Sequence, residues 1–93
     1  MTRVVHCKKE PYDVYIGRHH AGVPRKDWGV WGNPFALKSE ADRARVLADY
    51  RAWLMDQPEL LRKLHTLKGK KLGCWCHPKP CHGDVLAELA DKI

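Results

Sequence analysis

The order of strand-like and helix-like segments along the chain is typical of one small α/β domain. Three segments have the residue types of strands, and three have helical periodicity. The strands are expected at residues 2–7, 12–16 and 70–76, and the helices at about residues 39–55, 58–68 and 83–93. The expected fold is a small mixed three-stranded sheet with about three helices, in the order β-β-α-α-β-α. Since the chain has only 93 residues, we expect a single domain over residues 1–93.

The lengths of the connections predict how the strands pair. The charged turn at residues 8–11 is short, which favours an antiparallel hairpin between the first two strands. The helices between the second and third strands favour a parallel pairing through a right-handed crossover. That pairing brings the ends of strands two and three to one edge of the sheet, where open α/β sheets bind ligands. Cys7, ending a strand of opposite direction, is expected at the other edge.

The segment at about residues 18–38 has no periodicity and is predicted to be a long loop. It contains Trp28, Trp31 and Phe35, three large aromatic residues that argue against disorder. Loops of this length in compact domains are often binding loops. The aromatic rings are suited either to stacking on a base or to packing against the core, and the sequence leaves both roles open.

The charge balance restricts the kinds of partner. The chain has 17 Lys and Arg residues against 11 Asp and Glu residues, a formal net charge of +6. This excess favours a phosphate-bearing ligand or a nucleic acid. No segment has the roughly 20 apolar residues of a membrane span, and the first residues lack the apolar region of a signal peptide. We therefore expect a cytoplasmic protein without a membrane partner; its oligomeric state is left open.

The four cysteines are expected to be reduced, and three of them lie in one short segment. Cys74, Cys76, Cys81 and His82 are candidate ligands of a zinc ion, the one candidate cofactor, although no second knuckle lies elsewhere in the chain. Cys74 is equally suited to a buried strand position. Cys81 lies just before a helix, where the helix dipole lowers a thiol pKa, so we expect it to be the most accessible thiol to an alkylating reagent.

The same helix start suggests an anion site. The unpaired N–H groups of residues 82–84 are suited to a phosphate or a carboxylate, with Lys79 adding charge. Asp84 is either a contact to a ribose or base or a favourable charge in the first helical turn. The ligand-binding residues that we predict from the loop and this helix are Arg18, Trp31, Asn33, Phe35, His82 and Asp84.

Several motifs together resemble a small domain family of bacteria and phages whose function is unknown. They are the opening Val-Val-His-Cys strand, Tyr-Ile-Gly-Arg at residues 15–18, Trp-Gly-Asn-Pro-Phe at residues 31–35, and Cys-Trp-Cys with Cys-His-Gly-Asp at residues 74–84. The resemblance covers nearly the whole chain. It implies a phage or bacterial accessory protein, and it transfers no activity.

The function predicted from these features is binding of a nucleotide-like or phosphate-bearing ligand in a crevice at the strand ends. One alternative is a zinc-stabilised nucleic-acid-binding module. The other is a small enzyme that acts on nucleosides or nucleotides through Cys81, His82 or Asp84, with no catalytic residue assigned among them.

Overall fold

The computed structural model describes residues 1–35 and 37–93, so residue 36, in the loop expected at residues 18–38, lies outside the described residues. Within them the fold has three strands, three α-helices and three short 3₁₀ turns. The strands are β1 (Arg3–His6), β2 (Val14–Tyr15) and β3 (Lys71–Cys74). The helices are α1 (Arg43–Met55), α2 (Pro58–Lys63) and α3 (His82–Asp91), and the turns are η1 (Arg25–Asp27), η2 (Glu40–Asp42) and η3 (Leu64–Thr66). The expected α/β class and element order are confirmed.

β3 is the central strand of the sheet and pairs with both other strands in parallel. Leu72 of β3 is opposite Val4 of β1 on one side and Val14 of β2 on the other. The predicted parallel pairing of β2 with β3 is confirmed. The antiparallel hairpin of β1 and β2 is wrong, because the two strands do not pair with each other and all three strands run in the same direction.

The link at residues 7–13 explains why this hairpin does not form. Since β1 and β2 flank β3 and run in the same direction, the link must return past β3 to start β2. Tyr12 lies against Gly73 of β3, where a Cβ atom would be only 2.7 Å from Cγ of the tyrosine ring. The absent side chain at Gly73 therefore makes room for a link that is too short to hold a crossover helix.

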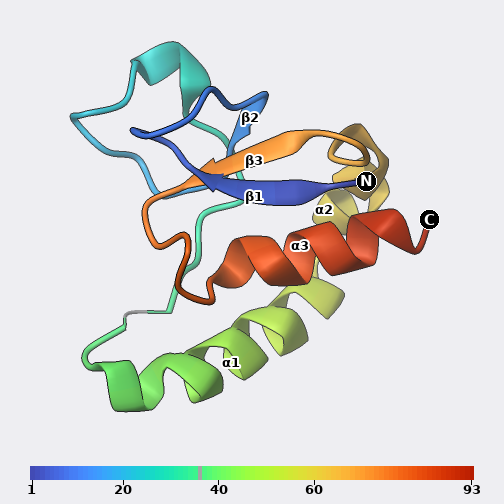
Figure 1. Ribbon diagram of the computed structural model, residues 1–93. Helices are drawn as coiled ribbons and strands as arrows, with labels where there is room; N and C mark the ends of the chain where they lie inside the picture. Colours follow the sequence, from blue (N-terminus) through green and yellow to red (C-terminus); the bar gives the residue numbers. More distant parts are fainter. Residues whose placement is uncertain (36) are drawn as a thin grey trace.

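One face of the sheet is covered by helices, and we call it the helix face. α3 packs directly on β1 and β3, and α1 packs against α3 on the side away from the sheet (Figure 1). Apolar side chains from all these elements form the main core, including the fully buried Ile16, Leu54, Leu72 and Leu86. In the described part of the chain, no helix is long and apolar enough to cross a membrane.

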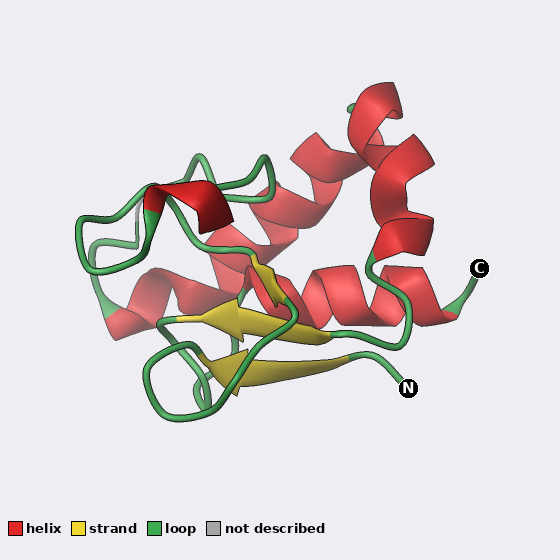
Figure 2. Ribbon diagram, turned by 90° about the horizontal axis from the view of Figure 1, so that it is seen from above, coloured by secondary structure: helices red, strands yellow, loops and turns green. Residues whose placement is uncertain are grey.

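The opposite face, which we call the loop face, is covered by irregular chain and the η1 turn (Figures 1 and 2). A second and smaller cluster lies here, formed by the buried Cys7, Tyr15 and Val23. Tyr12, Trp28 and Trp75 pack around this cluster and remain partly exposed. The aromatic side chains thus take the place of a second helix layer.

Candidate ligand-binding site

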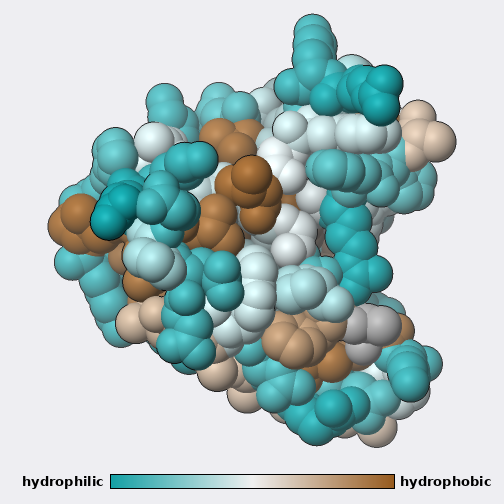
Figure 3. Space-filling view, turned by 180° about the vertical axis from the view of Figure 1, so that it is seen from behind, coloured by the Kyte–Doolittle hydropathy of each residue, from teal (hydrophilic) through white to brown (hydrophobic). Residues whose placement is uncertain are grey.

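A cavity of about 310 Å³ lies at the carboxyl ends of β2 and β3. Residues just after β2 line it, together with residues of the long loop, residues at the end of β3 and the first residue of α3. Seen from behind, a notch separates the part of the surface formed by the long loop from the part formed by the start of α1 (Figure 3). The position follows from the parallel sheet, since both strands end at this edge.

Arg18 lies at the boundary of this cavity and connects two parts of the long loop. Its Nε donates a hydrogen bond to the carbonyl oxygen of Asn33 at 2.7 Å, and its Nη2 donates to the carbonyl oxygen of Phe35 at 2.9 Å. The carbonyl oxygen of Arg18 itself accepts a bond from the Tyr15 hydroxyl at 2.6 Å. These contacts use two of the five guanidinium N–H groups and fix the side chain beside the cavity.

Asn33 and Phe35 form an ordered turn in the cavity wall. The side-chain oxygen of Asn33 accepts a hydrogen bond from the backbone N–H of Phe35 at 2.9 Å. This Asx turn explains the Asn-Pro-Phe sequence, and it directs the half-buried Phe35 ring against the main core at the edge of the cavity. Both residues line the cavity, as predicted.

His82, the first residue of α3, also lines the cavity and is only 8% exposed. Its Nε2 donates a hydrogen bond to the carbonyl oxygen of Ile16 at 2.6 Å. Its ring meets that of Tyr50 edge to face, with centroids 5.0 Å apart. Burial lowers the pKa of His82, because the charged imidazolium would lose its hydration. A neutral His82 therefore links α3 to the end of β2.

Seven of the cavity-lining residues were not among the predicted ligand-binding set, and three of these seven carry aromatic rings. Tyr15, His20 and Trp75 line the cavity, and the ring of His20 lies over that of Trp75 with centroids 4.4 Å apart. The indole N–H of Trp75 donates to the Tyr15 hydroxyl at 2.9 Å. Trp75 lies between two cysteines in sequence. Because successive side chains of an extended segment point to opposite faces, Trp75 points away from the face of the buried Cys74. That alternation was the signal available in the sequence.

Two of the predicted binding residues do not line the cavity. Trp31 is 5% exposed in the main core, and its carbonyl oxygen accepts a hydrogen bond from the Tyr50 hydroxyl at 2.9 Å. Asp84 is exposed on α3, and its carboxylate accepts a bond from the backbone N–H of Cys81 at 3.0 Å, which caps the helix. Their side chains therefore serve packing and helix capping in this structure.

All four cysteines are free. Cys74 and Cys81 are both buried, with their sulfur atoms 3.1 Å apart, and Cys81 also accepts a bond from the N–H of Gly83. The sulfur–sulfur hydrogen bond lowers the pKa of Cys74 and raises the pKa of Cys81. The expectation that Cys81 is the most accessible thiol is wrong, because its side chain packs inward as a helix cap. Cys76 is the more exposed thiol.

Cys7 also differs from its expected position. Because β1 runs parallel to β3, Cys7 lies at the same edge as Cys74, to whose carbonyl oxygen its N–H donates a bond of 2.9 Å. The expected position at the opposite edge is wrong. The side chain of Cys7 packs in the loop-face cluster, and burial raises its pKa.

The predicted zinc ligands Cys74, Cys76, Cys81 and His82 are close in sequence, but their geometry does not form a metal centre. Over residues 1–35 and 37–93, no group of three or more His, Cys, Asp or Glu side chains is placed to hold a metal ion. The sulfur atoms of Cys74 and Cys81 bond to each other, and Nε2 of His82 bonds to Ile16. Zinc binding therefore stays a prediction that this arrangement does not support.

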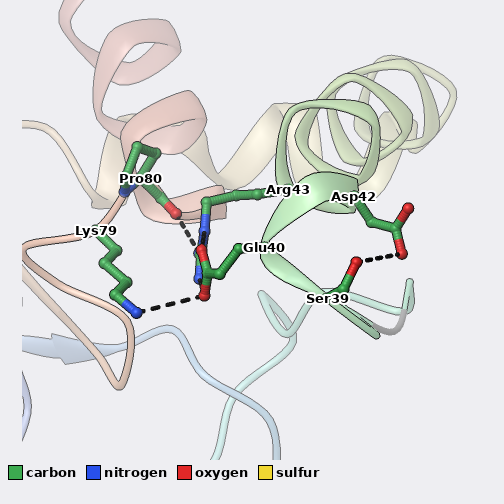
Figure 4. Close-up of polar contacts among 6 residues, drawn as sticks. All are labelled: Ser39, Glu40, Asp42, Arg43, Lys79 and Pro80. Atoms are coloured by element: carbon green, nitrogen blue, oxygen red, sulfur yellow. Dashed lines mark hydrogen bonds and ion pairs between the residues drawn. The ribbon is translucent and has the colours of Figure 1, made fainter.

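A polar cluster fixes the loop before α3 to the start of α1 (Figure 4). The Arg43 guanidinium donates to the Glu40 carboxylate at 2.9 Å and to the Pro80 carbonyl oxygen at 2.6 Å. Arg43 lowers the pKa of Glu40 to about 2. Lys79, which was expected to add charge for an anion, lies 3.4 Å from the Glu40 carboxylate instead.

Comparisons with known proteins identify relatives without a stated activity. The family described as "Domain of unknown function (DUF4326)" matches residues 2–92. The protein described as "Uncharacterized 12.4 kDa protein in nrdA-td intergenic region" of Enterobacteria phage T4 is 32% identical over 93 residues, which are 100% of this chain and 81% of that protein. No solved structure matches. The resemblance to an uncharacterised family with phage members is confirmed.

Proposed function

Because the chain belongs to the family described as a domain of unknown function (DUF4326), whose description gives no activity, we propose a function from the cavity itself. The protein binds a nucleotide-like ligand, with a flat heteroaromatic ring in the cavity and a phosphate group at Arg18. The proposal depends on one observation: aromatic rings and a fixed guanidinium line the same cavity at the carboxyl ends of parallel strands.

The size and lining of the cavity suit a planar ring. Its volume of about 310 Å³ is at the lower end of the 300 to 1,000 Å³ that is typical of small-ligand pockets. Phe35, His20 and Trp75 provide ring surfaces in its walls. Stacking between a base and an aromatic side chain contributes about 1 to 3 kcal/mol and tolerates different bases. A nucleobase is therefore a better match than a flexible aliphatic ligand.

Directional recognition is available from the polar groups of the walls. The side-chain oxygen of Asn33 is used by Phe35, so its amide group supplies two N–H donors for a ligand carbonyl. The remaining N–H groups of Arg18 are suited to a phosphate oxygen, because hydrogen bonds between charged partners are the strong ones. The net charge of +6 favours the approach of an anion.

Calorimetric titration with nucleosides, mononucleotides and inorganic phosphate tests the proposal. We expect mononucleotides to bind more tightly than nucleosides, and phosphate alone to bind least. Phe35→Ala is expected to weaken the binding of both nucleosides and mononucleotides, because it removes a stacking surface. Arg18→Gln is expected to abolish the difference between them and its dependence on salt.

Arg62→Gln is the matched control, because this arginine lies on α2 and pairs with Glu59 at the surface. It is expected to leave binding unchanged. Thermal melting of each variant separates loss of binding from loss of folding. If folded wild-type protein binds none of the nucleosides or mononucleotides, the proposed function is wrong.

A further inference from the structure

A second hollow adjoins the cavity on the other side of Arg18. It is a more open groove of about 430 Å³, lined by His19, Val30, Pro34 and glycines of the long loop. Gly17, Arg18 and Asn33 line both hollows and form the boundary between them. Each hollow has the volume of a pocket for one nucleoside-sized group.

Consecutive residues contribute an imidazole ring to each hollow. His20 lines the cavity, and its ring is tilted by 37° to that of Trp75, with centroids 4.4 Å apart. His19 lines the groove, and its ring is stacked on that of Trp28 at 4.6 Å and an angle of 10°. Arg25 lies 5.3 Å from the centroid of Trp28 and adds a cation to this stack. Each hollow therefore has an imidazole ring in contact with an indole ring, stacked in the groove and tilted in the cavity.

The charged side chain of the two linings lies at the boundary that the hollows share. Of the described residues that line either hollow, Arg18 is the one Lys or Arg, and none is Asp or Glu. Its position at the shared boundary places a single positive charge between two ring-binding surfaces. This matches one phosphodiester between two nucleosides, whereas a chain of phosphates would need several cations.

We propose that the ligand is a pair of nucleosides joined by one phosphodiester, with one base in the cavity, the second in the groove and the phosphodiester at Arg18. The proposal deepens the proposed function and rests on it, because the first base occupies the same cavity. Such a unit is found both in a free dinucleotide and in a single strand of nucleic acid, and the chemistry at the site is the same.

The test compares mononucleotides, dinucleoside monophosphates and tetranucleotides by calorimetric titration. We expect a dinucleoside monophosphate to bind about tenfold more tightly than a mononucleotide, or better, because a second base is stacked. If the source is a nucleic-acid strand, the tetranucleotide binds at least as tightly as the dinucleotide. If it is a free dinucleotide, the added nucleotides weaken binding. Both results support a site for two nucleosides.

His19→Ala and His20→Ala are a matched pair of variants, because the two histidines are adjacent in sequence and both exposed. His19→Ala is expected to remove the gain from the second nucleoside and to leave mononucleotide affinity unchanged. His20→Ala is expected to weaken both ligands by a similar factor. His19→Phe keeps a ring on Trp28 and is expected to retain the tighter binding of the dinucleoside monophosphate. If His19→Ala acted only by disordering the loop, a ring at this position would not be expected to restore that binding.

The outcomes distinguish this inference from the proposed function. Equal affinities for mononucleotides and dinucleoside monophosphates would overturn the inference and leave the proposed function intact. Equal loss of both ligands in His19→Ala would also overturn it. If a nucleoside triphosphate gained more affinity over the mononucleotide than a dinucleoside monophosphate did, the inference would be overturned, because the groove would then bind further phosphates and not a second nucleoside. If the folded protein bound none of these ligands, the proposed function itself would be wrong.

Discussion

The two faces of the sheet are covered in different ways. On the helix face, α3 and α1 bury a continuous set of aliphatic side chains such as Leu54, Leu72 and Leu86. On the loop face, a small cluster around Tyr15 is surrounded by partly exposed aromatic rings. Hydrogen bonds also hold the loop face, including Tyr12 to Asp27 at 2.7 Å and the bonds of Tyr15 to Trp75 and Arg18.

This difference separates stability from recognition. Buried aliphatic contacts contribute through the removal of apolar surface from water, so the helix face supplies most of the free energy of folding. The loop face keeps ring surfaces and polar groups accessible, and both hollows open among its residues and the adjoining loop. Substitutions on the helix face should therefore change stability, and substitutions near the loop face should mainly change binding.

The largest effect is expected from Leu86→Ala on the helix face. Leu86 of α3 is fully buried in the main core, and truncation of such a residue typically costs about 2 to 5 kcal/mol. Leu37→Ala, at a residue that is 38% exposed beside the cavity, is the matched control and should cost less than about 1 kcal/mol. Chemical denaturation measures both. Equal losses would contradict the division between the faces.

A smaller change in stability, with a clear loss of binding, is expected from Tyr15→Phe. The hydroxyl accepts a bond from the Trp75 indole and donates to the Arg18 carbonyl oxygen, so its removal leaves two groups without this partner. We expect about 1 to 3 kcal/mol of destabilisation and weaker nucleotide binding. Denaturation and titration of the same sample check the pair of effects. Unchanged binding would show that this hydroxyl does not position the cavity wall.

The smallest effect is expected at high pH and concerns Tyr12 of the loop face. Its hydrogen bond to Asp27 raises the pKa of Tyr12 to about 12, above its ordinary value of 10. A raised pKa stabilises the fold fully below pH 10, and this contribution is lost as the pH rises towards 12. The partly exposed position keeps the loss below the roughly 1.4 kcal/mol per pH unit that one group can contribute.

Stability measured from about pH 10 to about pH 12, the two pKa values of Tyr12, should therefore decline less in Tyr12→Phe than in the wild type. The variant keeps the ring against Gly73 and removes only the titrating hydroxyl. Identical declines in the two proteins would show that the bond between Tyr12 and Asp27 does not hold the loop face.

Part of the site could be predicted from local signals alone. Arg18, Asn33, Phe35 and His82 all line the cavity, because strand ends, a turn sequence and a helix start each place them at one edge of a parallel sheet. Trp31 and Trp75 could not be assigned in this way. Both are aromatic residues beside a turn or strand end. The alternation of Trp75 with two cysteines indicates only that it points away from the face of Cys74, and the packing shows that Trp31 fills the core and Trp75 lines the cavity.

The sequence by itself determined the α/β class, the order of the elements and the parallel pairing of β2 with β3, because periodicity and the length of a crossover are local properties of the chain. Only the tertiary structure decided the direction of β1, the burial of Cys81 and the positions of His19 and His20 beside separate hollows. These features depend on contacts between distant residues, such as Tyr12 with Gly73 and Cys74 with Cys81. Such contacts form only when the elements pack together, so no local pattern specifies them.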